Sequence, residues 1–372
     1  MFAWSGEKSG EKTLYFEELR GIDGMVSAVL GGSLKKRWAS CGGPGSGGLG
    51  GVRRVLGRGA REVLLVGLLC GSGRVWAQVI PAAPQPQGVA AEAPLRDARK
   101  LIDAGEFQQA ATLLKGYLQT EKGSAAAHEL LAYSELRLND AKDSLEEYTR
   151  AAAITHPSAE DLQNVAKDYV LLGDMKDAEH WALVAVQMDE RDAEGWYVLG
   201  RIRFTLQRFQ EAAACFERSL VLLPRSVKAE NNLGLSYEGL NRTDDAIAAY
   251  RQAIAWQEGV EHPSEQPLLN LGIILIHQEK LADAKEVLVK AVAIAPGDPR
   301  IREELGHLYL DLKMLPEAKQ QLEAAIALEP KKPALHFLLG KVYHQEGQEA
   351  KAKAEFVLSA QLSGYHATPE NP

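Results

Sequence analysis

Apolar residues recur at helical spacing through the second part of the chain, and five of these stretches contain a Leu-Gly pair. They read WYVLGRIRFT (196–205), AENNLGLSYE (229–238), LLNLGIILIH (268–277), REELGHLYLD (302–311) and HFLLGKVYHQ (336–345). Alanine is abundant after residue 90 and β-branched runs are scarce, which favours helix in that region. The pattern therefore predicts an all-α protein.

The glycines of these pairs mark an internal repeat. Most neighbouring pairs are 34 residues apart, and one pair is 38 apart. An alanine follows each glycine by twelve residues. These repeat positions are Gly200, Ala212, Gly234, Ala246, Gly272, Ala284, Gly306, Ala318, Gly340 and Ala352. With alanine in place of glycine the frame extends backwards to eight units, which begin near residues 91, 125, 159, 193, 227, 265, 299 and 333.

Small residues at these positions have a packing explanation. A glycine or alanine on the first helix of a unit and an alanine on the second let the two backbones approach, and larger residues fill the gap to the next unit. Glycine inside a helix costs about 0.5–1 kcal/mol relative to alanine, so its recurrence implies a packing need. Ser158 with Asp161, and Asp298 before Pro299, are typical of helix starts.

A period of 34 residues with a small residue in each of two helices resembles the tetratricopeptide repeat. Two consecutive units carry the match through Trp196, Leu199, Gly200, Phe209, Ala212, Phe216 and Pro224, then Leu233, Gly234, Tyr237, Ala246, Tyr250 and Ala253. The resemblance implies a right-handed superhelical solenoid of antiparallel helix pairs over residues 91–366, followed by a tail at 367–372. Residues 255–267 contain the four extra residues and are expected to form a longer turn.

Residues 52–77 have the layout of a secretory signal. Four arginines precede an apolar run of nine residues (63–71), and Ala77 occupies a position where a signal peptidase would cleave. The run is too short to span a bilayer as a helix, which needs roughly 20 residues. Residues 1–77 contain 11 Lys and Arg against 6 Asp and Glu, whereas the whole chain has a net charge of −8. A basic head on an acidic body is the asymmetry expected of a targeting segment.

The signal layout predicts a periplasmic or secreted protein, and a cytoplasmic one if the segment is not functional. Residues 1–51 are then either a disordered extension or not part of the natural protein, whose translation would start at Val52. Residues 78–90 are expected to form a Pro- and Gln-rich linker. The acidic remainder offers no basic footprint for nucleic acid. We expect no integral membrane span.

Catalytic and metal-binding constellations are not found in the sequence. It lacks HExxH, GxSxG, the phosphate-binding GxxxxGK[ST], and GxGxxG after a strand. Cys41, Cys70 and Cys215 form no CxxC pair, and Cys215 is predicted to be a small core residue. His307 and His344 occupy related places on two first helices, where solvated groove residues are the favoured interpretation over a metal site. We predict no enzyme activity, cofactor or metal.

The resemblance implies that successive first helices line a concave groove. Groove positions include the residue two places before each repeat glycine, which is Asn164, Val198, Asn232, Asn270, Glu304 or Leu338. Asparagine both donates and accepts hydrogen bonds, so stacked asparagines are similar to the ladder with which some long members hold a peptide backbone. The alternative is that asparagine is simply common at an exposed position.

Nearby groove positions form a mixed basic and aromatic patch. Arginine and aromatic residues are enriched at binding hot spots, so this patch is suited to a partner's acidic or aromatic segment. The family's dicarboxylate clamp is not expected, because Tyr197 and Gln266 stand where its lysines belong. The patch residues are Lys167, Tyr197, Arg201, Phe204 and Asn231.

These features together predict a non-catalytic scaffold of the cell envelope that binds a segment of another protein in the groove. Two alternatives stay open, a structural assembly subunit of an envelope complex and a substrate-recruiting accessory of an enzyme on another chain. Val357, Leu358 and Leu362 would leave an apolar C-terminal end through which the chain self-associates. Lys351, Lys353 and Glu355 would instead give that end a polar outer face.

Overall fold

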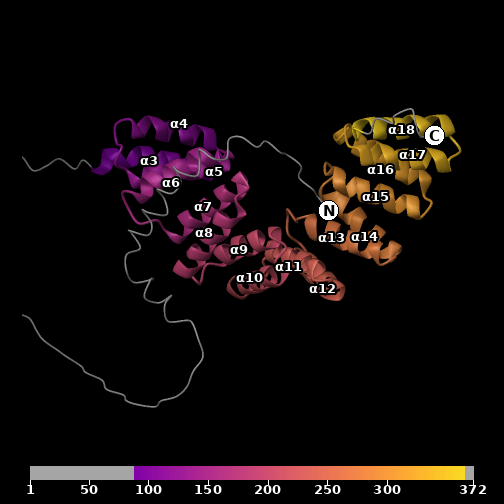
Figure 1. The fold of residues 1–372 in the computed structure, drawn as a ribbon, viewed down its shortest axis with the longest axis horizontal. Coiled ribbons are helices and arrows are strands. Elements are labelled where there is room, and N and C mark those ends of the chain that lie inside the picture. The colour runs from indigo at the N-terminus through magenta and orange to yellow at the C-terminus, as the bar shows by residue number, and fades with distance from the viewer. Residues whose placement is uncertain (1–87, 365–372) are drawn as a thin grey trace, which may run out of the picture. The chain divides into compact units, whose positions relative to one another are not determined.

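In the computed structural model, residues 88–364 form an array of helix pairs joined by short turns (Figure 1). Odd-numbered helices are the first helices of the eight pairs, and even-numbered helices are the second. The helices are α3 (Gly88–Asp103), α4 (Phe107–Leu118), α5 (Ala125–Arg137), α6 (Ala141–Ala152), α7 (Ala159–Leu172), α8 (Met175–Met188), α9 (Ala193–Thr205), α10 (Phe209–Leu222), α11 (Val227–Gly239), α12 (Thr243–Trp256), α13 (Gln266–His277), α14 (Leu281–Ile294), α15 (Pro299–Asp311), α16 (Leu315–Leu328), α17 (Pro333–Gln345) and α18 (Glu349–Leu362).

The all-α expectation and the count of about eight units are confirmed. From α5 onward the first helices begin within one residue of the expected unit starts. Helix α3 begins at Gly88, so the last three residues of the expected linker are helical, as an Ala-rich stretch favours. The signal-like segment, the extension at 1–51, most of the linker and the tail lie outside the described residues.

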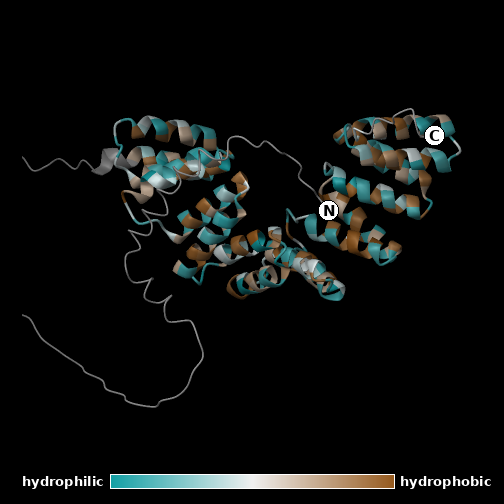
Figure 2. Cartoon of the chain, viewed as in Figure 1, coloured by the Kyte–Doolittle hydropathy of each residue, from teal (hydrophilic) through white to brown (hydrophobic). Residues whose placement is uncertain are grey.

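The described residues divide into two compact units. Residues 88–138 with 146–156 form the first, and residues 139–145 with 157–364 form the second. The first has a core of alanines and leucines from α3, α4 and α5, including Leu114 and Leu131. The second has a larger core that runs from α12 to α18. Helices α13 and α14 contribute many apolar residues to it (Figure 2).

Glycine notches hold the two helices together in the last five pairs, from α9/α10 to α17/α18. A Cβ added to Gly234 would lie 2.5 Å from the Tyr250 ring, and one added to Gly272 would lie 2.5 Å from Leu288. Gly200, Gly306 and Gly340 face Phe216, Leu322 and Phe356 in the same way. The alanines twelve residues later are at most 1% exposed. The small first-helix residue therefore receives a large side chain from its own partner helix, sixteen positions on, rather than only opening space toward the next unit.

The turn inside each pair requires a left-handed backbone at one repeat position. Residues there have φ between +56° and +78° in all eight described pairs. Three are glycine and two are asparagine, which tolerate this region, and three are longer side chains. The positions are Gly105, Asn139, Gly173, Gln207, Asn241, Glu279, Lys313 and Gly347.

The expected helix starts and the longer turn are present. Ser158 and Asp161 form a capping box on α7, and the Asp298 side chain accepts from the backbone N–H of Arg300. The longer turn lies between α12 and α13, where the buried Gln257 side chain closes it. Its Nε2 donates to the Ser264 carbonyl over 2.8 Å and its Oε1 accepts from the Ser264 N–H over 2.7 Å.

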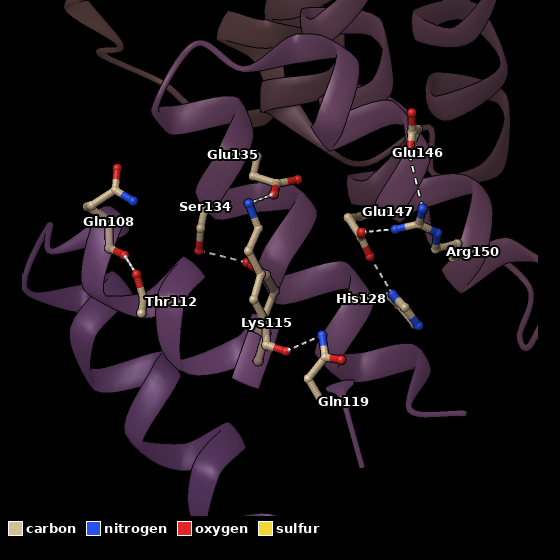
Figure 3. Close-up of polar contacts among 11 residues, drawn as sticks. Gln108, Thr112, Lys115, Gln119, His128, Ser134, Glu135, Glu146, Glu147 and Arg150 are labelled. Atoms are coloured by element: carbon tan, nitrogen blue, oxygen red, sulfur yellow. Dashed lines mark hydrogen bonds and ion pairs between the residues drawn. The ribbon is translucent and has the colours of Figure 1, made fainter. Parts of the chain in front are cut away.

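Buried ionisable side chains also join the helices of a pair. In the first compact unit, His128 Nδ1 lies 2.5 Å from a Glu147 carboxylate oxygen, and His128 Nε2 lies 3.1 Å from the Lys122 carbonyl. Arg150 contacts Glu147 as well, and Lys115 on α4 pairs with Glu135 on α5, which links two successive pairs (Figure 3). His336 repeats the pattern in the last pair, with Nδ1 2.8 Å from Glu355 and Nε2 2.9 Å from the Pro330 carbonyl. His128 and His336 thus anchor the start of a first helix to its second helix and to the preceding turn.

Candidate functional site

Side chains of α7, α9, α11 and α13 connect neighbouring first helices, which contact one another in sequence through α15. Lys228 Nζ lies 4.4 Å from the centroid of the Tyr197 ring and pairs with the Glu194 carboxylate. Asn270 Nδ2 donates to Asn231 Oδ1 over 2.9 Å. Most predicted site residues thus lie on successive first helices, and several of them contact one another. We give the name first-helix face to a set of exposed or half-buried residues on α7, α9, α11, α13 and α15, which are Lys167, Tyr197, Arg201, Lys228, Asn232, Asn270 and Glu304.

Two of the predicted asparagines lie inside the protein. Asn164 is 3% exposed and its Oδ1 accepts from Lys167 Nζ over 3.1 Å. Asn231 is 8% exposed and accepts from Asn270. Val198, which interrupts the asparagine positions, is also buried. These residues therefore position their neighbours on the first-helix face rather than forming its surface.

The half-buried Asn232 and Asn270 side chains use their amide nitrogens for contacts within the array. Asn232 Nδ2 donates to the Lys228 carbonyl over 2.7 Å and lies 3.4 Å from Tyr197 Oη. Asn270 Nδ2 donates to Asn231. Within residues 88–364 neither Oδ1 atom has a hydrogen-bond partner. The two amides therefore keep acceptor atoms available, where a ladder that both donates and accepts was expected.

The aromatic residues of the patch are held by the core behind it. The Tyr197 and Phe216 ring centroids are 5.8 Å apart, and the Phe204 and Phe209 centroids are 5.4 Å apart. Tyr197 and Phe204 are both half-buried and pack against the cluster that contains Phe216. Arg201 is exposed one turn beyond Tyr197. The patch thus combines fixed aromatic rings with a solvated guanidinium.

Lys167 is a half-buried cation at the α7 end of the first-helix face. Burial lowers the pKa of its ammonium group, and the charges of Glu194 and Glu160 act in the opposite direction. No carboxylate in the described range forms an ion pair with it, so its one direct polar contact is Asn164. Repulsion from the Lys228 ammonium also lowers the pKa of Lys167.

Glu304 is a half-buried carboxyl on α15, at the repeat position of Asn232 and Asn270. Burial raises the pKa of this carboxyl, and the neighbouring Glu303 charge raises it further. Glu303 itself is paired with Lys332, 2.6 Å between Nζ and a carboxylate oxygen. Among described residues, no side chain forms an ion pair or hydrogen bond with Glu304.

Sequence reasoning missed Lys228, which bridges α9 and α11. The sequence does show that Lys228 lies one helical turn before Asn232, at the start of a first helix. In the structure, the side chain at this position contacts the previous first helix. That contact depends on how adjacent units stack, so spacing within one unit did not indicate it.

The described part holds no group of three or more His, Cys, Asp and Glu side chains arranged around an ion. His344 lies 3.0 Å from Glu349 and His307 has no ion pair in this range. Cys215 is buried, as predicted, with Arg203 Nη1 3.3 Å from its sulfur.

Between residues 88 and 364, no helix combines the length and the apolar character that crossing a membrane requires.

Comparison with known proteins identifies the class. A sequence model of the Tetratricopeptide repeat family matches residues 95–160, 166–229, 197–260 and 231–299, and a TPR repeat model matches 306–347. The chain belongs to the tetratricopeptide repeat family. This family consists of protein–protein interaction scaffolds that are generally non-catalytic.

Individual relatives share parts of the array. The chain is 28% identical over 141 residues to human Cilia- and flagella-associated protein 70, covering 37% of this chain and 12% of that protein. It is 26% identical over 121 residues to Anaphase-promoting complex subunit 6 of Arabidopsis thaliana, covering 32% of this chain and 22% of that one. The solved APC/C hetero-tetramer Cut9–Hcn1 matches with a TM-score of 0.53 at 16% identity, over 75% of this chain and 55% of that one. This chain therefore spans less than a quarter of those two sequence relatives.

Proposed function

We propose that this chain binds an extended segment of a partner protein on the first-helix face, and that the segment carries acidic or aromatic residues. The observation that carries the proposal is the pair of half-buried amide oxygens on Asn232 and Asn270 that have no hydrogen-bond partner within residues 88–364. An extended segment presents a backbone N–H at regular intervals, which these acceptors are placed to receive.

Charge and preorganisation support the same partner chemistry. Lys167 and Arg201 have no carboxylate partner in the described range, so both are available to an acidic side chain. Tyr197 is fixed by Phe216 and by Lys228, so little side-chain freedom remains to be lost on binding. The face is therefore already ordered before a partner arrives.

Removing both amides tests this function. We expect Asn232→Ala with Asn270→Ala to reduce capture of the partner from an envelope extract by about tenfold, because two acceptors are lost from the contact. The control is Gln252→Ala with Gln320→Ala, which removes two exposed amides from second helices. Quantitative mass spectrometry of the captured proteins gives the measurement. Equal capture by the wild type and by both double variants would remove the proposal.

An assembly role is the second candidate. On α18, Val357 is 47% exposed and Leu358 is 37% exposed, and on α17 Phe337 is 51% exposed. The similarity to a protein named as a subunit of the anaphase-promoting complex also favours it. An assembly subunit, or a recruiting accessory of an enzyme on another chain, would keep its stable partners in the asparagine double variant. The variant Phe337→Ser with Val357→Ser tests this role. If it loses both self-association and the partners that the asparagine double variant keeps, assembly through the C-terminal end is favoured.

We further propose that the chain acts in the cell envelope, after export through residues 52–77. The proposal is supported by the layout of residues 52–77, in which arginines are followed by an apolar run and then by Ala77, as in a secretory signal. Leu65→Arg interrupts the apolar run, so we expect it to leave uncleaved protein in the cytosol, whereas Leu34→Arg should be exported normally. N-terminal sequencing of the wild type should give Gln78 first. A cytosolic wild-type product that retains residues 53–77 would contradict export.

A further inference from the structure

The first-helix face carries opposite charges at its two ends. Lys167, Arg201 and Lys228 lie on α7, α9 and α11, and of these only Lys228 pairs with a carboxylate within residues 88–364. At the other end, α15 places Glu303 and Glu304 side by side. Glu303 is already neutralised by Lys332. Glu304 is thus the carboxyl that this end leaves without a counter-charge.

The surroundings of Glu304 do not compensate its charge. His307 on the same helix and Lys332 at the start of α17 both lower its pKa, but burial and Glu303 outweigh them. Lys332 is engaged by Glu303 and, over 3.5 Å, by Glu329. A half-buried carboxyl without a partner has lost part of its hydration without gaining an ion pair. A cation supplied from outside the chain would restore that interaction.

We propose that the segment bound on the first-helix face carries a basic side chain that pairs with Glu304, in addition to an acidic group near Lys167. This inference rests on the proposed function and adds the orientation of the segment, with its acidic part over α7 to α11 and its basic part over α15. The same alternation of charge argues against a nucleic acid, which needs a uniformly basic track.

The repeat geometry sets the spacing of the two charges. Packed helices lie about 8–10 Å apart, so the four steps from α7 to α15 span roughly 30–40 Å. An extended chain advances about 3.3 Å per residue, so the acidic and basic residues should be separated by about 10–12 residues. A partner segment shorter than this would reach only one end.

Selection from a library of random 16-residue peptides, displayed on phage and panned against the full chain, tests the pattern. We expect enrichment of an acidic residue and a basic residue about 10–12 positions apart. The most enriched peptide is then synthesised and its Kd measured by fluorescence anisotropy. Glu304→Gln in the protein, or the basic residue changed to Gln in the peptide, should each weaken binding roughly 5- to 10-fold. The two changes combined should weaken it no further, because they remove one shared interaction.

Glu303→Gln is the matched control, because it removes a neighbouring carboxylate that already forms an ion pair with Lys332. This variant should change Kd less than twofold. If peptides bind through Asn232 and Asn270 but carry no basic residue, or ignore Glu304→Gln, the inference is wrong and the proposed function stands. Equal weakening by the Glu303 and Glu304 variants would also overturn it, as a response to net charge alone. If no peptide is enriched, or the asparagine double variant binds every peptide normally, both proposals fall together.

Discussion

Truncating Leu288 to alanine should lower the free energy of unfolding by about 2–5 kcal/mol. The Leu288 side chain is fully buried and fills the notch at Gly272, where an added Cβ would lie 2.5 Å from it. Because the glycine has no side chain that could move into the space, the variant leaves a cavity between α13 and α14. Urea denaturation followed by circular dichroism at 222 nm measures the change.

The next residue on the same helix provides the control. Val289 is 42% exposed, so Val289→Ala should change the free energy of unfolding by no more than about 0.5 kcal/mol. Both variants remove apolar atoms from α14, and only one of them empties a notch. Similar midpoints for the two variants would show that the notch does not hold this helix pair together.

Filling a notch should also destabilise the protein, although alanine favours helix more than glycine does. Overpacking in Gly234→Ala should cost roughly 1–3 kcal/mol and leave a net loss of up to about 2 kcal/mol, since the new Cβ would lie 2.5 Å from the Tyr250 ring. The ring has little freedom to retreat, because it is fully buried and its hydroxyl donates to Glu238. The gain in helix propensity, about 0.8–1 kcal/mol, is smaller than the overpacking cost.

Gly116 gives the opposite expectation for the same substitution. It lies in α4, where a Cβ would meet no heavy atom within 4 Å, so Gly116→Ala should stabilise by about 0.4–1 kcal/mol. Thermal melts of the two variants beside the wild type compare these directions. A Gly234→Ala protein that melts above the wild type would contradict the packing account.

The binding surface was only partly predictable from the sequence. The repeat frame placed Asn232 and Asn270 at related positions, because helical periodicity assigns a face to each residue. It did not show that Asn164 and Asn231 are buried, since burial depends on the side chains that adjacent units bring. Lys228 was missed for the same reason, because its contact with Tyr197 joins residues 31 positions apart in different units.

The sequence by itself determined the class of structure and the place of each helix pair. A 34-residue recurrence of glycine, alanine and large apolar residues specifies two helices per unit. The tertiary structure decided which polar atoms remain available. Asn232 and Asn270 use their amide nitrogens in hydrogen bonds within the array, and Glu304 alone of its pair lacks a counter-charge. Hydrogen bonds and ion pairs between units depend on distances that a repeat pattern does not encode, so the chemistry of the face emerges only once the units are stacked.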